Sequence, residues 1–221
     1  LAANSDATTL TVTINDDDSG TDFVEIPVVV NNVAPVVTLA ALAPIEEHAA
    51  TDVTGEFEDP GLADTHDVIV DWDDPNNGTD SVFSLPATNL LAVGDTFLAS
   101  DGATLEILSI IGDTVAFSVS EHQYSDDGPS GLQPTGANGT AADDSPVSLT
   151  VVDKDDDGFG SGTGSDATWL TVFNVAPTVV IEPLAPIVEN STTDITGEFT
   201  DPGLADTHDV IVDWNDPNNG A

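Results

Sequence analysis

The stretch DPGLADTHDVIVDW at residues 59–72 decides the fold prediction, because it recurs unchanged at residues 201–214. The match extends outward from this block. Residues 33–79 return as residues 175–221, 142 positions later, with 34 of the 47 positions identical. Self-similarity at a fixed period is typical of proteins built from tandem structural repeats. The sequence therefore predicts a repeat protein.

A second matched pair fixes the predicted repeat boundaries. Residues 10–35 and 149–177 share LTV, an Asp-rich loop and an NVAP tetrapeptide, and the second copy carries three extra residues in its loop. We therefore predict three domains, which are the C-terminal part of one repeat at 1–32, a complete repeat at 33–174 and the N-terminal part of the next repeat at 175–221. Because the chain contains no Met, we expect it to be an excerpt of a longer protein.

Within the complete repeat, apolar residues alternate in short runs rich in Val, Thr and Ile, the pattern typical of β-strands. These runs cover residues 36–39, 53–57, 68–72, 82–85, 105–110, 115–119, 147–152 and 169–173. Pro, Gly and Asp-rich turns separate them, and no long helical period interrupts them. The fold class predicted is all-β, an antiparallel Ig-like sandwich with an inserted β-hairpin at about 87–113. Residues 125–145, rich in Gly, Asp, Ser and Pro, are predicted as a long surface loop.

The net charge of the chain excludes some classes of binding partner. The chain has 41 Asp plus Glu against one Lys or Arg, a formal net charge of -40. Nucleic acids and anionic membrane surfaces are excluded as partners, since binding them depends on basic side chains. No apolar run is long enough for a membrane span, and the absence of Cys excludes thiolate sites. So many carboxylates attract hard cations such as calcium, which prefers oxygen ligands.

Several motifs resemble those of the PKD domain, an Ig-like sandwich that occurs in tandem in large secreted and cell-surface proteins. They are NVAP at 32–35 and 174–177, Glu47 and Glu189, F-x-DPG at 57–61, VDWD at 70–73, H-x-Y-x-DDG at 122–128 and the triple Asp at 155–157. They span the whole repeat. Two features depart from the family pattern, namely DPNNG at 74–78 and the inserted hairpin. The resemblance implies an extracellular repeat without catalytic residues.

The loop at 153–158, DKDDDG, places carboxylates at its first, third and fifth positions with Gly sixth, as an EF-hand does. Gly164 stands where the EF-hand has its bidentate Glu, and no helices flank the loop, so an EF-hand is excluded. A partial calcium site made by Asp153, Asp155 and Asp157 stays open. So does the alternative that these are solvated turn residues, since Asp favours turns. The first copy offers Asp16 and Asp18 in the equivalent loop but has Ile14 in place of Asp153.

Sandwich topology groups the candidate ligands at two ends. The loop carrying Asp59 and Asp64 is expected at the same end as the 153–157 loop. Glu47 is expected at the opposite end, beside Asp201 and Asp206 of the next repeat. Like charges in such proximity repel unless a cation or protons neutralise them. The metal-ligand candidates are therefore Asp59, Asp64, Asp153, Asp155, Asp157, Glu47, Asp201, Asp206, Asp16 and Asp18, with Ca²⁺ as the cofactor.

The four His residues show no zinc spacing and are interpreted as structural hydrogen-bonding residues. No Gly-x-Ser-x-Gly elbow occurs, and only 5% of the chain is aromatic, which disfavours a hydrolase or a glycosidase. Trp72, Trp169 and Trp214 are predicted as core residues. The chain is predicted to be no enzyme.

We expect a structural or adhesive repeat of a large extracellular or cell-surface protein, stiffened by calcium at the junctions between repeats. Its partners would be neighbouring repeats, a homopolymer of the same chain, or cell-surface glycans or proteins. Two alternatives stay open. One is a surface-layer or filament subunit that assembles by head-to-tail strand complementation. The other is an accessory carbohydrate-binding module of a secreted hydrolase, which would need exposed aromatic residues on one sheet face.

Overall fold

The computed structural model describes residues 5–74, 78–127, 141–154, 162–189, 191–204 and 206–215. These residues form β-strands and one short 3-10 helix, with no α-helix among them. The strands are β1 (Ser5–Asn15), β2 (Thr21–Asn31), β3 (Val36–Leu39), β4 (Ile45–Glu46), β5 (Ala50–Glu58), β6 (Thr65–Asp71), β7 (Ser81–Leu85), β8 (Thr96–Leu98), β9 (Thr104–Ile111), β10 (Thr114–Gln123), β11 (Ala142–Lys154), β12 (Thr163–Phe173), β13 (Thr178–Ile181) and β14 (Gly197–Thr200), and the 3-10 helix η1 is Thr88–Leu90.

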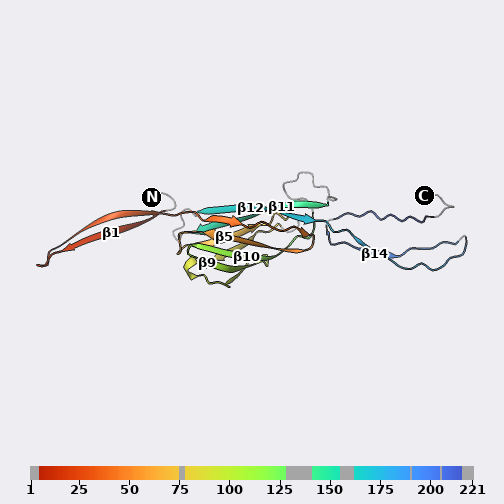
Figure 1. Cartoon of the computed structure of the whole chain (residues 1–221), viewed down its shortest axis with the longest axis horizontal. Coiled ribbons are helices and arrows are strands. Elements are labelled where there is room, and N and C mark those ends of the chain that lie inside the picture. The colour runs from red at the N-terminus through yellow and green to blue at the C-terminus, as the bar shows by residue number, and fades with distance from the viewer. Residues whose placement is uncertain are drawn as a thin grey trace.

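Strands β3 to β12 form two five-stranded sheets, in the orders β3-β5-β10-β9-β8 and β4-β12-β11-β6-β7, which make up the central body in Figure 1. All pairs are antiparallel except β4 with β12. Side chains alternate strictly along β5, with every second residue buried. The two inner faces meet in one core around Phe57, Trp72, Phe117 and Leu149. The predicted all-β antiparallel sandwich is confirmed, and the segment predicted as an insertion, 87–113, contains the hairpin β8–β9.

Strand direction determines which loops meet at each end of the sandwich. At one end β5 finishes, β6 begins and β11 finishes, and Asp153 lies opposite His66 in the β11–β6 register. We call this the Asp59 end. At the other end β5 begins and β10 finishes, with Gln123 opposite Ala50. Strand β12 also finishes there, where Phe173 pairs with Glu46 of β4. We call this the Glu47 end.

Two further hairpins extend away from the sandwich in opposite directions (Figure 1). Hairpin β1–β2 lies beyond the Asp59 end and carries the sequence counterpart of β11–β12, yet every residue of β2 is exposed. Hairpin β13–β14 lies beyond the Glu47 end, and its residues are exposed as well. Among the described residues, the structure contains no helix with the length and apolarity needed to cross a bilayer.

Two predictions about local structure are corrected. Strand β11 begins at Ala142, so the last residues of the predicted 125–145 loop are strand, while residues 128–140 lie outside the described residues. Trp72 is buried as predicted, but Trp169 is 55% exposed and Trp214 54% exposed. Trp169 points outward because side chains alternate along β12. Leu170 and Val172 point into the core, so Trp169, the residue before Leu170, lies on the outer face.

Candidate metal centres

The Asp59 end is built on a tight corner that closes β5. Asp59 Oδ1 accepts a hydrogen bond from Gly61 N at 2.8 Å, which bends the chain from β5 towards β6. Asp59 Oδ2 lies 3.0 Å from His66 Nε2, and the His66 ring packs on Phe57 with centroids 4.7 Å apart. The predicted structural hydrogen bonding of His66 is therefore present.

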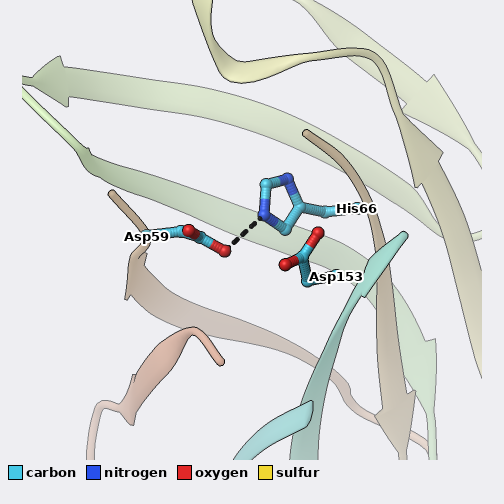
Figure 2. A group of neighbouring side chains, drawn as sticks. All are labelled: Asp59, His66 and Asp153. Carbon is cyan, nitrogen blue, oxygen red and sulfur yellow. Dashed lines mark hydrogen bonds and ion pairs between the residues drawn. The ribbon is translucent and has the colours of Figure 1, made fainter. Parts of the chain in front are cut away.

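Asp153, the penultimate residue of β11, completes a buried group with this pair. Figure 2 shows its carboxylate beside the His66 ring, on the side away from Nδ1. Asp59, His66 and Asp153 are 1%, 0% and 0% exposed, and each offers one ligand atom within 4.8 Å of the others. Asn32 Nδ2 donates to Asp153 Oδ2 at 2.5 Å. We call these three residues the Asp59 triad.

The Asp59 triad leaves polar atoms unsatisfied. Neither His66 Nδ1 nor Asp153 Oδ1 has a hydrogen-bond partner among the described residues. Burial raises the pKa of Asp153, the Asn32 hydrogen bond lowers it, and the nearby Asp59 charge raises it further. Two carboxylates thus share a buried site with one imidazole, a mixed oxygen and nitrogen donor set, whereas calcium prefers oxygen ligands.

The other candidates predicted for this end have different outcomes. Asp64 lies in the same corner, where Asp64 N donates to Gly61 O at 2.9 Å and its carboxylate occupies the space that a Cβ of Gly61 would fill. It is not a member of the Asp59 triad. Asp155 and Asp157 lie outside the described residues. His66 was not among the predicted ligands, although the Asp59-x₆-His66 spacing recurs as Asp201-x₆-His208.

Asp16 and Asp18 lie in the exposed turn between β1 and β2. Asp16 Oδ1 accepts hydrogen bonds from Asp18 N at 3.2 Å and from Gly20 N at 2.6 Å. Neither residue belongs to a group of three metal-ligating side chains within the described part of the chain. Their arrangement fits the turn-forming alternative, in which Asp bonds its own backbone.

The Glu47 end brings together residues from two consecutive predicted repeats. Glu47 N donates to Phe173 O at 2.9 Å, and Glu47 Oε1 accepts from Val175 N at 2.7 Å, which ties the side chain to the linker. Glu47, Asp201 and Asp206 each offer a carboxylate oxygen within 4.8 Å of the others. We call this group the junction triad. Its three members are the residues that the topology argument assigned to this end.

Gly203 allows the two repeats to approach in the junction triad. A Cβ at this position would lie 2.8 Å from Glu47 Oε2 and would also crowd the Asp206 carboxylate. Leu204 N, the next residue, donates to Ser125 O at 3.2 Å. The corner of the second repeat therefore contacts the first repeat through backbone as well as through carboxylates.

A further pair of carboxylates, Asp126 and Asp127, forms a second group with Glu47 at the same end, with ligand oxygens within 4.8 Å of one another. All three side chains are buried, at 3% to 4% exposure. We call this group the Glu47–Asp126–Asp127 triad. The sequence did not identify this group as a candidate metal site, although both Asp residues belong to the H-x-Y-x-DDG motif at 122–128.

The core explains why Asp126 and Asp127 lie there. A β-bulge between Val119 and His122 includes Glu121 with a φ of 78°, and bulges re-aim the residues that follow them. His122 then stacks on Trp72 at 4.3 Å, and Tyr124 OH donates to Trp72 O at 2.6 Å. Because Tyr124 O accepts from His48 N, at 2.6 Å, the segment that follows is anchored next to Glu47.

The Glu47 end carries a concentrated negative charge. Burial, followed by the charges of Glu47 and Asp126, raises the pKa of Asp127 to about 6. Burial and then the Asp206 charge raise the pKa of Asp126. Glu47 Oε2, both carboxylate oxygens of Asp126 and Asp127 Oδ2 have no hydrogen-bond partner among the described residues. These orphaned, all-oxygen ligands fit calcium, which takes 6 to 8 oxygens in flexible geometry.

The sequence matches no protein-family model and no curated protein. The resemblance to PKD-type repeats therefore stays a prediction.

Proposed function

We propose that this chain is a non-enzymatic structural or adhesive repeat of a large extracellular or cell-surface protein, of the PKD type, whose junctions are stiffened by calcium. The observation that carries the proposal is the junction triad, in which Glu47 of one repeat lies with Asp201 and Asp206 of the next. A cation bound there would link two repeats that otherwise share a short linker and few backbone contacts.

Charge balance supports a cation at this place. The chain has a single Lys or Arg. That residue, Lys154, pairs with Asp67 at the Asp59 end and is unavailable to the Glu47 end. Two like charges about 4 Å apart repel by about 4 kcal/mol at an effective dielectric constant near 20. Calcium would supply the missing positive charge, and Glu47, Asp201 and Asp206 would hold it.

The affinity range of such sites fits an extracellular location. Extracellular calcium modules bind with dissociation constants of about 0.1 to 1 mM. At ten times its dissociation constant, an ion stabilises the folded state by about 1.4 kcal/mol. The junction would therefore be rigid where calcium is millimolar and loose where it is not.

Thermal unfolding of the whole chain tests the proposal. We expect the melting temperature to rise between chelator and about 10 mM calcium at constant ionic strength, and protease cleavage in the 174–177 linker to slow. The variant D201N/D206N should lose the linker protection. The matched control D17N/E25Q removes two exposed charges from hairpin β1–β2 and should keep it. A linker cut equally fast with calcium and with chelator contradicts the proposal.

One observation favours the carbohydrate-binding alternative. Trp169 and Phe173 are 55% and 45% exposed on the outer face of β12. Sugar rings stack on exposed aromatic rings, and Trp169 was predicted in the core. Binding to a panel of immobilised glycans that W169A abolishes would support this alternative. Absence of binding by the wild-type chain would reject it.

A further inference from the structure

The Glu47 end holds five candidate carboxylate ligands in two groups. Its five carboxylates, from Glu47, Asp126, Asp127, Asp201 and Asp206, do not form one group but two triads that share Glu47. Two oxygens on opposite sides of one calcium ion are about 5 Å apart, since each Ca–O distance is about 2.4 Å. In each triad, taken separately, the ligand oxygens lie within that distance of one another.

The negative charge of the Glu47 end also favours two ions over one. With Asp143 included, since its charge acts on both Asp126 and Asp127, a single calcium ion would leave four of six negative charges uncompensated, whereas two ions would leave two. Glu47, Asp126 and Asp127 are each more than nine-tenths buried, and each has at least one oxygen without a hydrogen-bond partner in the described part of the chain. Buried charges persist when they are paired or bind metal.

We propose that the Glu47 end binds two calcium ions bridged by the Glu47 carboxylate, one held within the repeat by Asp126 and Asp127 and one held across the junction by Asp201 and Asp206. A bridging carboxylate holds two metal ions about 4 Å apart. The inference rests on the function proposed above and adds a second ion, with its own ligands, to it.

The two proposed calcium sites differ in which parts of the chain supply their ligands. The Glu47–Asp126–Asp127 triad lies within one sandwich and is fixed by the His122 and Tyr124 contacts. The junction triad requires the corner of the following repeat. The inner ion therefore binds first and orients Glu47, so that the junction ion binds more tightly to a repeat that already holds calcium.

Counting bound calcium in the whole 221-residue chain tests the proposal, because ions bound elsewhere cancel in the difference between variants. Equilibrium dialysis at neutral pH should show that D201N/D206N loses one ion and E47Q loses two. D126N/D127N should lose one ion and bind the junction ion at least several-fold more weakly. The control D17N/E25Q should lose none. Circular dichroism checks that each variant keeps its β-structure.

The outcomes separate this proposal from the function on which it rests. If D201N/D206N loses one ion while D126N/D127N loses none and leaves the affinity unchanged, the bridged pair is wrong and the calcium junction stands. If neither double variant loses an ion, both are wrong.

A measurement on the wild-type chain does not depend on how the variants fold. Mn²⁺ replaces calcium in oxygen sites and is paramagnetic. Two Mn²⁺ ions about 4 Å apart should give a spin-coupled electron paramagnetic resonance spectrum, whereas D201N/D206N, which keeps only the inner ion, should give the spectrum of an isolated ion. A spectrum of isolated ions in the saturated wild-type chain overturns the bridged pair.

Discussion

The 14 residues DPGLADTHDVIVDW lie in two different settings in this chain. In the first copy they contain β6, which pairs with β7 and β11, and Val68, Val70 and Trp72 are at most 1% exposed. In the second copy the described residues 206–215 form no strand, and Val210, Ile211 and Trp214 are 76%, 88% and 54% exposed. The same sequence is a core strand only where neighbouring strands pair with it and cover its apolar face.

The corner before the strand is nevertheless alike in both copies. Asp59 and Asp201 each bond the His seven residues later, at 3.0 and 2.5 Å. The ring of that His packs on the preceding Phe at 4.7 Å in both copies. The same local side-chain bonds are therefore present in both corners, whereas the strand requires tertiary partners.

The largest difference between the copies is expected at the tryptophans. Trp72→Ala removes a buried ring and should lower the free energy of unfolding by about 3 to 5 kcal/mol. Trp214→Ala changes an exposed position and should stay within about 0.5 kcal/mol. Urea unfolding followed by circular dichroism measures both. Equal losses would mean that the second copy is packed as the first is.

The histidines should differ less. His66→Gln breaks a fully buried hydrogen bond and should cost about 1 to 3 kcal/mol. His208→Gln acts on a partly exposed bond and should cost less than about 1 kcal/mol. The urea unfolding midpoints of the two variants measure this difference. A larger loss for His208→Gln would show that the second corner carries more stability than its exposure indicates.

The stability of the Glu47 end should depend on pH in the presence of chelator. Because the pKa of Asp127 is raised in the fold to about 6, the folded state favours its neutral form. Its contribution to stability is present at low pH and is lost as the pH rises through 6. Between pH 7 and pH 5 the free energy of unfolding should rise by about 1 kcal/mol from this group.

The variant D127N isolates that contribution, since Asn does not titrate. Its free energy of unfolding should rise less than that of the wild-type chain over the same pH range. Identical pH profiles for the two chains would contradict the assignment. At millimolar calcium the difference should shrink, because the proposed inner ion holds Asp127 ionised.

The smallest effect is expected at Lys154, the one basic residue, for which the first partial copy has Asn15. Its ion pair with Asp67 joins side chains that are 46% and 18% exposed, and such pairs contribute less than about 1 kcal/mol. Lys154→Met should therefore change the free energy of unfolding by less than about 0.5 kcal/mol. A loss above about 1.5 kcal/mol would mean that this end depends on Lys154 for charge compensation.

Much of the fold could be predicted because it depends on short-range patterns. The period of two in runs such as 147–152 predicts strands, and strand direction then places Glu47 and Asp153 at opposite ends. The same reasoning failed for Trp169. An aromatic residue in a strand lies in the core only if it falls on the inward-facing set of alternate residues, and in β12 that set contains Leu170 and Val172 instead.

The sequence by itself determined the repeat, the all-β class and the pairing of Glu47 with Asp201 and Asp206, since identity between copies, alternation and connectivity are all properties of the chain order. Only the tertiary structure revealed the places of Asp126, Asp127 and His66. Asp126 and Asp127 reach Glu47 because a bulge and the stack of His122 on Trp72 direct their segment. His66 reaches Asp153 through the β11–β6 register. Such contacts join residues far apart in the chain, and no local pattern encodes the distance between them.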